Sequence, residues 1–216
     1  MRPRCYMVST DLCDIYYSVP IDKEHQKYLK FIWQGNLYQF TCLAQGLSSA
    51  PHLFTKLMKP VFSFLRELGH LSSGYLDDSF LLGYSREECQ ANIDDTLTLY
   101  YDLGFLPHKV KSVTIQTQVL HRPGFVLNSL DMTVSISVDE HQKLKCAAQR
   151  IRDSVSTTIR EVAQLIGMMV SCFPGLEYRE LFYCQLEIEK AAALKTTYGD
   201  FDQTMPLSTL ASVDIS

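Results

Sequence analysis

The amino-acid sequence predicts a mixed α+β fold, in which an antiparallel sheet is backed by helices and followed by a small helical region. Three observations predict it. Short β-like runs alternate with two amphipathic helical patterns up to about residue 136, and beyond it nearly all patterns are helical. Tight-turn residues join neighbouring strand segments, as in antiparallel hairpins. We therefore expect two regions, residues 1–136 and 137–216.

The first half contains three strand segments and the strongest helical pattern. Residues 6–11 form the first predicted strand, and residues 28–34 and 37–42 form a hairpin around Gly35-Asn36. Residues 51–68 repeat apolar side chains at helical spacing, with Pro60 expected to bend the helix and Gly69 to end it.

Residues 71–84 predict strand, turn and strand, with Asp77 and Asp78 at the bend. Ser85 and Glu88 predict a capping box that opens a helix ending at Gly104. Short strands follow to about residue 136. The helical tail is expected at residues 139–152, 158–172 and 176–194, with a capping box of Thr158 and Glu161 opening the second of these helices.

Composition limits the function classes. The chain has 216 residues, 46% hydrophobic and 20% charged, which is enough for a folded core. It contains no apolar run of about 18 residues and no secretory signal pattern, so we expect an intracellular protein of the cytoplasm or nucleus without a membrane segment. Its seven cysteines lack a C-x-x-C pair, which predicts reduced thiols. The net charge of −4 opposes tight binding of a polyanion by this chain alone.

Three carboxylates are the candidate chemical site. Asp11 ends an apolar strand, and Asp77 and Asp78 lie between two others. If these strands are neighbours in one sheet, the three acids converge and need a cation to offset their repulsion. Oxygen-only ligation suits Mg²⁺, with Mn²⁺ as a substitute, and two such ions about 3.5–4 Å apart can activate a hydroxyl and stabilise a leaving pyrophosphate. Alternatively, the Asp-Asp pair is ordinary turn chemistry.

Five segments, in order, resemble the palm of a reverse transcriptase, an RNA-directed DNA polymerase. They are residues 11–21, with an aromatic residue five positions after Asp11; residues 43–51 (LAQGLSSAP); the YLDD sequence at 75–78; residues 103–112; and residues 124–132, similar to a primer grip. The tail, through residues 158–167, 178–181 and 190–194, is similar to the thumb and connection of retrotransposon polymerases, closest to DIRS-like or gypsy-like elements. The resemblance also implies that the fingers are largely missing.

The resemblance implies roles for individual residues. Asp11, Asp77 and Asp78 would be the catalytic and metal-binding residues, and Lys111 a proton donor to pyrophosphate. The nucleotide-binding residues would be Leu12, Ile15, Tyr16, Gln45 and Gly46, with Tyr16 excluding a 2′-hydroxyl; Tyr75 and Phe125 would contact primer or template. The implied partners are an RNA or DNA template–primer duplex, deoxynucleoside triphosphates and other domains of a retroelement polyprotein.

Several residues depart from the family pattern or remain ambiguous. Ile15 replaces Ala or Gly and is expected to crowd the sugar pocket, at a cost of about 1–3 kcal/mol; Ala44 replaces Pro before Gln45. A catalytically silent, truncated remnant that acts as a binding or assembly module is therefore the alternative, ahead of an unrelated metal-dependent phosphohydrolase. Lys111 is also compatible with a solvated surface position. The basic residues on the first tail helix are equally compatible with phosphate contacts and with a solvated face: Lys143, Lys145, Arg150 and Arg152. None of the six histidines has metal-ligand spacing, and none is assigned a role.

Overall fold

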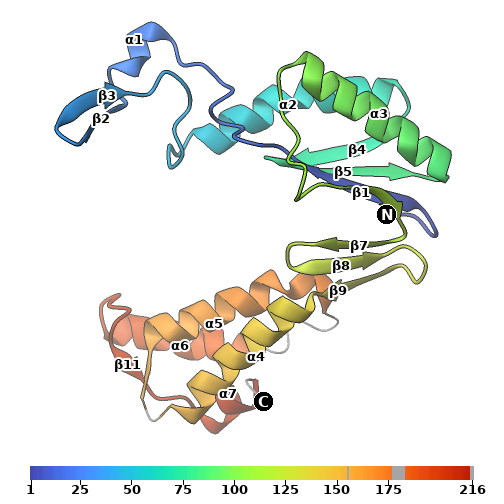
Figure 1. The fold of residues 1–216 in the computed structure, drawn as a ribbon. Coiled ribbons are helices and arrows are strands. Elements are labelled where there is room, and N and C mark those ends of the chain that lie inside the picture. Colours follow the sequence, from blue (N-terminus) through green and yellow to red (C-terminus); the bar gives the residue numbers. More distant parts are fainter. Residues whose placement is uncertain (155, 177–182, 215–216) are drawn as a thin grey trace. The chain divides into compact units, whose positions relative to one another are not determined.

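The computed structural model describes residues 1–154, 156–176 and 183–214. It confirms the mixed α+β class (Figure 1). The chain divides into two compact units, residues 1–120 with 129–132, and residues 121–128 with 133–216. The functional division predicted between residues 136 and 137 stays a prediction. Among the described ranges, no helix combines the length and apolar character needed to cross a bilayer.

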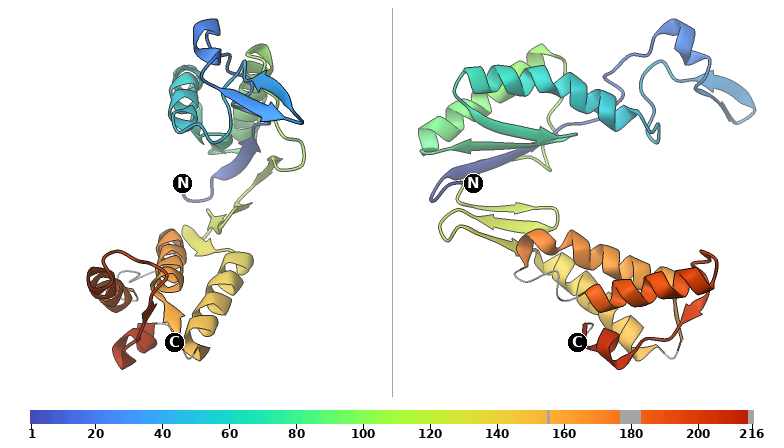
Figure 2. Two further views of the ribbon diagram at one scale, coloured as in Figure 1. Left: turned by 90° about the vertical axis from the view of Figure 1, so that its left-hand side faces the viewer. Right: turned by 180° about the vertical axis from the view of Figure 1, so that it is seen from behind.

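The first unit is built on a four-stranded antiparallel sheet with the order β4-β5-β1-β6. Its strands are β1 (Tyr6–Asp11), β4 (Leu71–Tyr75), β5 (Asp78–Gly83) and β6 (Val113–Thr117). Helices α2 (Ala50–Glu67) and α3 (Arg86–Asp102) lie on the same face of this sheet (Figures 1 and 2). The predicted sheet backed by helices is therefore confirmed.

The core of the first unit lies between α2 and the end of β1. It consists of apolar side chains from the loop after β1, from α2 and α3, and from the loop after α3: Leu12, Ile15, Phe54, Met58, Val61, Phe62, Leu65, Tyr100 and Phe105. Their spacing on α2 confirms the predicted helical stripe, and Gly69 follows the helix with φ +89°, a conformation that glycine adopts without strain. Burial of this stripe attaches α2 to the chain that leaves the strand carrying Asp11.

Two predicted turns are displaced by one residue. In the hairpin of β2 (Lys30–Trp33) and β3 (Asn36–Gln39), Trp33 pairs with Asn36, so Gln34-Gly35 forms the turn rather than Gly35-Asn36. Both turn residues have positive φ, as a type I′ hairpin turn requires. Likewise, Tyr75 pairs with Asp78, so the turn of the β4–β5 hairpin is Leu76-Asp77 and Asp78 already belongs to β5.

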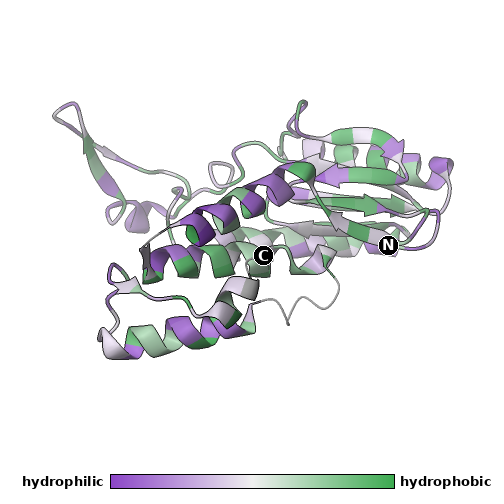
Figure 3. Cartoon of the chain, turned by 90° about the horizontal axis from the view of Figure 1, so that it is seen from below, coloured by the Kyte–Doolittle hydropathy of each residue, from purple (hydrophilic) through white to green (hydrophobic). Residues whose placement is uncertain are grey.

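The β2–β3 hairpin has an unusual surface. It extends away from the sheet, and a short helix, α1 (Lys23–Gln26), precedes it (Figure 1). The apolar residues of both strands are exposed: Ile32 by 73%, Trp33 by 61% and Leu37 by 65%. Figure 3 shows hydrophobic residues on both of its strands. The hairpin therefore leaves much of its apolar surface exposed.

The cap of α3 differs from the prediction in one bond. The Ser85 side chain accepts a hydrogen bond from the Glu88 backbone, as expected. The Glu88 carboxylate, however, accepts from the Tyr84 N–H instead of the Ser85 N–H, because it reaches one residue further back. The prediction of a reciprocal capping box at Ser85 and Glu88 was therefore wrong. The predicted Thr158–Glu161 box of the second unit is confirmed.

The second unit is mainly helical. A sheet of β7 (Val119–Arg122), β8 (Phe125–Asn128) and β9 (Thr133–Ile136) leads into it. Then follow α4 (Val138–Asp153), β10 (Thr157–Thr158), α5 (Ile159–Ser171), η1 (Phe173–Gly175), α6 (Cys184–Thr196), β11 (Thr204–Met205) and α7 (Thr209–Asp214). Its core centres on α5, α6 and their neighbours: Ile151, Ile159, Val162, Leu165, Ile166, Leu186, Met205 and Ala211. The start of the helix predicted at 176–194 and the 178–181 segment fall largely outside the described residues.

Three of the cysteines lie in the interior, and the predicted reduced state of the thiols stays a prediction. Cys5, Cys89 and Cys172 are buried thiols. Burial raises the pKa of the Cys89 thiol to about 11, because a thiolate loses hydration there.

Gly83 and Gly167 provide a contrasting pair of glycine-to-alanine tests. A Cβ at Gly83 would overlap the backbone N and Cα of Cys89, which cannot move aside as a side chain would. Gly167 lies exposed within α5, and an added methyl group there would meet open space. We expect Gly83→Ala to lower the free energy of unfolding by about 1–3 kcal/mol and Gly167→Ala to raise it by about 0.5–1 kcal/mol. Urea titration checks both, and an unchanged midpoint for Gly83→Ala would contradict the close β5–α3 approach.

Candidate active site

The backbones of the three candidate aspartates lie next to one another at adjacent strand ends. Antiparallel register places Asp11, the last residue of β1, opposite Asp78, the first residue of β5. The Leu12 N–H donates a hydrogen bond of 2.9 Å to the carbonyl of Asp77 in the β4–β5 turn. The neighbouring-strand arrangement on which the sequence hypothesis depended is therefore present.

The other side of β1 is held by residues 106–112. The Cys13 N–H donates to the Leu106 carbonyl, and the His108 N–H donates to the Asp11 carbonyl, each at 2.7 Å. In return, the Asp11 N–H donates to the Ser112 hydroxyl at 3.1 Å. These bonds attach the segment to the strand end from which Asp11 projects.

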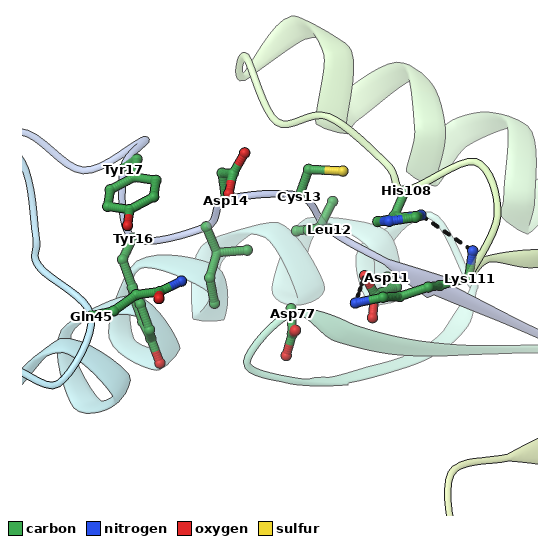
Figure 4. A pocket seen from close by; sticks show the side chains of 11 residues that line it. Asp11, Leu12, Cys13, Asp14, Tyr16, Tyr17, Gln45, Asp77, His108 and Lys111 are labelled. Carbon is green, nitrogen blue, oxygen red and sulfur yellow. Dashed lines mark hydrogen bonds and ion pairs between the residues drawn. The ribbon is translucent and has the colours of Figure 1, made fainter.

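This attachment positions Lys111 beside Asp11. The Lys111 Nζ lies 3.8 Å from Asp11 Oδ1, although 62% of the lysine side chain is exposed. Figure 4 shows the lysine extending along the strand to the carboxylate. Lys111 is thus both solvent-exposed and directed at the candidate site, so the two interpretations of its sequence position are compatible.

The Asp11 carboxyl experiences opposing influences. Burial raises its pKa above the usual aspartate value, the Lys111 ammonium lowers it, the charges of Asp77 and Asp78 raise it, and His108 lowers it. The net direction is upward, because burial and the two neighbouring carboxylates outweigh Lys111 and His108. A site with this balance gains from an added positive charge.

The chemistry of the donor set fits a divalent cation, since three carboxylates from adjacent strands offer only oxygen ligands. In the described part of the chain, however, no three His, Cys, Asp or Glu side chains are gathered as a metal-holding group. The sequence predicts converging side chains, whereas the structure brings the backbones together and pairs Asp11 with Lys111.

A pocket of about 450 Å³ opens beside these groups. It is lined by the end of β1, the loop after it, and three further segments: Asp11, Leu12, Cys13, Asp14, Ile15, Tyr16, Tyr17, Gln45, Asp77, His108 and Lys111 (Figure 4). Seven of the residues predicted from the sequence are therefore in one place: Asp11, Leu12, Ile15, Tyr16, Gln45, Asp77 and Lys111.

The remaining predicted residues lie outside the lining of this pocket. Gly46 follows Gln45 with φ +86°. Asp78 pairs with Asp11, and Tyr75, which is 76% exposed, pairs with Asp78. Phe125 lies on β8 in the second unit. Their predicted roles stay predictions.

Ile15 and Tyr16 connect the pocket with the core. Ile15 is 7% exposed and belongs to the core, and Tyr16 packs partly buried against it. The Tyr16 ring meets the Phe54 ring edge to face, with centroids 6.2 Å apart. Ile15 is therefore held in place by its packing in the core. The crowding of the sugar pocket that we expect from it stays a prediction.

Three residues near the site, Tyr100, His108 and Ser112, were not predicted from the sequence. The Tyr100 hydroxyl, fully buried, lies 2.6 Å from the Ser79 hydroxyl, behind the strand that begins with Asp78. Burial raises the pKa of Tyr100. His108 and Ser112 bracket the Lys111 turn. The sequence signal for His108 was its side-chain acceptor, which can bond backbone N–H groups two and three residues later, as is typical of turns.

Three of the four basic residues named on α4 lie beside acids. Lys143 lies 2.7 Å from Glu140, Arg150 lies 3.7 Å from Glu161, and Arg152 lies 3.5 Å from Asp153. Of the two interpretations left open by the sequence, these pairs favour a solvated helix face over a phosphate-binding stripe.

Comparison with known proteins identifies the family. The model of the family "Reverse transcriptase (RNA-dependent DNA polymerase)" matches residues 1–127, and the chain belongs to this family. It is 29% identical over 169 residues to the Gag-Pol polyprotein of Walleye dermal sarcoma virus, covering 75% of this chain and 9% of that protein. It is 27% identical over 114 residues to the Pro-Pol polyprotein of Simian foamy virus type 1, covering 53% and 10%. The chain thus spans about a tenth of these curated relatives.

Solved structures agree on the fold. The foamy viral protease-reverse transcriptase in complex with double-stranded DNA matches with a TM-score of 0.77 at 16% identity, covering 100% of this chain and 34% of that chain. The same protein in complex with an RNA/DNA hybrid matches at 0.75 and 18%, covering 100% and 27%. The resemblance inferred from the motifs is therefore confirmed for the family, and the relationship extends to retroviral Pol polyproteins.

The Tyr100–Ser79 contact generates a stability prediction. Tyr100→Phe removes the hydroxyl and leaves the buried Ser79 without this partner, so we expect a loss of about 1–3 kcal/mol in the free energy of unfolding. Ser79→Ala removes the other partner. In a double-mutant cycle measured by urea denaturation, the two losses should be less than additive, with a coupling of about 1 kcal/mol. Strict additivity would show that the two hydroxyls do not interact.

Proposed function

We propose that this chain is the palm and thumb of an RNA-directed DNA polymerase, which transfers deoxynucleotides to a primer 3′-hydroxyl under the direction of a template. The observation that carries the proposal is that the backbones of Asp11, Asp77 and Asp78 lie together at adjacent strand ends. Beside them opens a pocket lined by Asp11 and Asp77 and also by Tyr16, Gln45 and Lys111. Family membership supports the same activity.

The carboxylates are the metal-binding groups in this proposal. Asp11, Asp77 and Asp78 would hold two Mg²⁺ ions, with Mn²⁺ as a substitute. When bound, such ions favour ionisation of the attacking hydroxyl and offset charge on the phosphoryl oxygens. Backbone hydrogen bonds on both sides of Asp11 hold the strand end from which this carboxylate projects.

Other residues of the pocket bind, orient and move a proton. Lys111, 3.8 Å from Asp11, carries a proton on Nζ that it would donate to the leaving pyrophosphate. Gln45 offers an amide to the nucleotide, and Gly46 lets the backbone approach it closely. The Tyr16 ring, held by Phe54, would lie under the sugar and exclude a 2′-hydroxyl by contact.

The proposed partners are deoxynucleoside triphosphates and an RNA or DNA template–primer duplex. The related foamy viral structures are complexes with double-stranded DNA and with an RNA/DNA hybrid, which supports this choice. Other polyprotein domains are also proposed partners, because the matching relatives are polyproteins about ten times the span of the match.

We also propose a retrotransposon origin, DIRS-like or gypsy-like, for which the tail patterns at residues 158–167 and 190–194 are the support. Sequencing the reading frames on both sides tests it. A neighbouring ribonuclease H or recombinase frame of a retrotransposon supports this origin, whereas continuation into viral envelope sequence contradicts it.

Replacement of Asp77 tests the activity. Asp77→Asn removes one charge from the proposed metal site, and we expect extension of a DNA primer on an RNA template to fall at least about a hundredfold. Asp102→Asn, at the exposed end of α3, is the matched control and should extend at the wild-type rate.

Two outcomes would contradict the proposal. Undiminished extension by Asp77→Asn would remove the metal site from the mechanism. Failure of the wild-type chain to extend any primer would instead favour the catalytically silent remnant, in which the buried Ile15 obstructs the sugar pocket.

Tyr16 makes a prediction about sugar selection. Tyr16→Val removes the ring that would contact a 2′-hydroxyl, so incorporation of ribonucleotides should rise relative to deoxynucleotides by about tenfold. The ratio of kcat/KM for dTTP and UTP measures this preference. Tyr101→Val, exposed on α3, should leave the ratio unchanged. An unchanged ratio in Tyr16→Val would place sugar selection elsewhere.

A further inference from the structure

One ring nitrogen of His108 accepts hydrogen bonds from the backbone of its own turn. Its Nδ1 lies 3.3 Å from the backbone N of Val110 and 3.3 Å from the backbone N of Lys111. The turn is also closed by the Ser112 N–H, which donates to the His108 carbonyl at 3.0 Å. The imidazole therefore acts as the side-chain cap of the turn that presents Lys111.

These two contacts determine where the imidazole proton lies. A backbone N–H can only donate, so Nδ1 has to be the acceptor and carries no proton. In a neutral imidazole the proton is then on Nε2, which becomes a hydrogen-bond donor. The tautomer of His108 is thus set by the backbone of the turn.

The donor is directed at the pocket and not at the turn. His108 is half-buried and lines the pocket together with Asp11, Lys111 and Gln45. In Figure 4 one ring nitrogen is joined to Lys111, and the other lies on the opposite side of the ring, nearer Leu12 and Cys13. The two ring hydrogen bonds that His108 makes with the described residues both use Nδ1, which leaves the Nε2 donor to serve a ligand.

The chemistry of the surroundings indicates what kind of ligand. The Lys111 ammonium, 3.8 Å from Asp11, lines the same pocket as the ring, and Gln45 adds an amide there. A ring N–H that shares its pocket with the Lys111 ammonium suits an anionic group that offers several acceptor oxygens, such as a polyphosphate.

We propose that His108 is a nucleotide-binding residue, whose Nε2–H donates a hydrogen bond to a phosphate oxygen of the incoming deoxynucleoside triphosphate while Nδ1 holds the Lys111 turn. This inference rests on the proposed polymerase function. It assigns a second role to the segment that carries Lys111, because the same ring joins the turn to the substrate.

Two substitutions separate the two ends of the ring. The Oδ1 of His108→Asn can replace Nδ1 as the acceptor in the turn, but this variant has no group at the position of Nε2. The amide of His108→Gln can reach the position of Nε2, but this variant leaves the Val110 and Lys111 N–H groups without their acceptor. His141→Asn, exposed on α4, is the matched control.

The experiment combines a binding measurement with a structural one. The dissociation constant of dTTP with Mg²⁺ is measured without primer, so that no turnover occurs. Hydrogen exchange of the Lys111 amide reports the turn, and long-range ¹H–¹⁵N NMR of His108 at mildly alkaline pH reports the tautomer.

We expect the Nε2–H tautomer in the wild-type chain. His108→Asn should weaken dTTP binding about tenfold while keeping the Lys111 amide protected. His108→Gln should lose that protection and keep more of the dTTP affinity.

The ways in which the inference can fail are distinguishable. Equal dTTP affinity of the wild-type chain and His108→Asn, with the turn intact, would overturn the role of Nε2 and leave the proposed function standing. A proton on Nδ1 would overturn the tautomer and with it the inference. Absence of dTTP binding by the wild-type chain would overturn the proposed function and the inference together.

Discussion

The candidate site depends on how the last residue of β1 is held. Asp11 is paired with Asp78 on one side, and its backbone exchanges hydrogen bonds with His108 and Ser112 on the other. Backbone bonds of this kind cannot be rearranged without breaking the sheet or the turn. Because both neighbours are fixed to the same strand end, acidic and basic groups that are about a hundred residues apart in the chain meet at one pocket.

Holding like charges at this site lowers the free energy of unfolding, and the packing inside the first unit offsets part of that loss. Burial and like charges raise the pKa of Asp11. The ionised carboxylate is therefore less stable in the folded chain than in the unfolded chain, and it lowers the stability of the fold at neutral pH. Behind the acids, Ser79 bonds to the buried Tyr100, and α2 packs its apolar stripe against Leu12 and Ile15. Residues next to Asp11 and Asp78 are thus fixed by the core, while Asp11 and Asp77 line the pocket.

Much of this arrangement could be predicted from the sequence, because strand, helix and cap signals are local. The strand ending at Asp11, the apolar stripe of α2 and the Thr158–Glu161 box all follow from spacing within one element. What could not be predicted depends on register or on side-chain direction. Both displaced turns are set by which residues pair across a hairpin. The role of His108 depends on a turn conformation that a lone histidine does not reveal.

The exposed β2–β3 hairpin has a consequence for anyone who studies this chain by spectroscopy. Trp33 is the only tryptophan of the sequence, and it lies on that hairpin with most of its ring in water. Because the ring is already in water, we expect melting of the sheet and helices to change its emission little. The same indole would shift towards the blue as soon as another surface covered the hairpin, which makes it an intrinsic reporter of association.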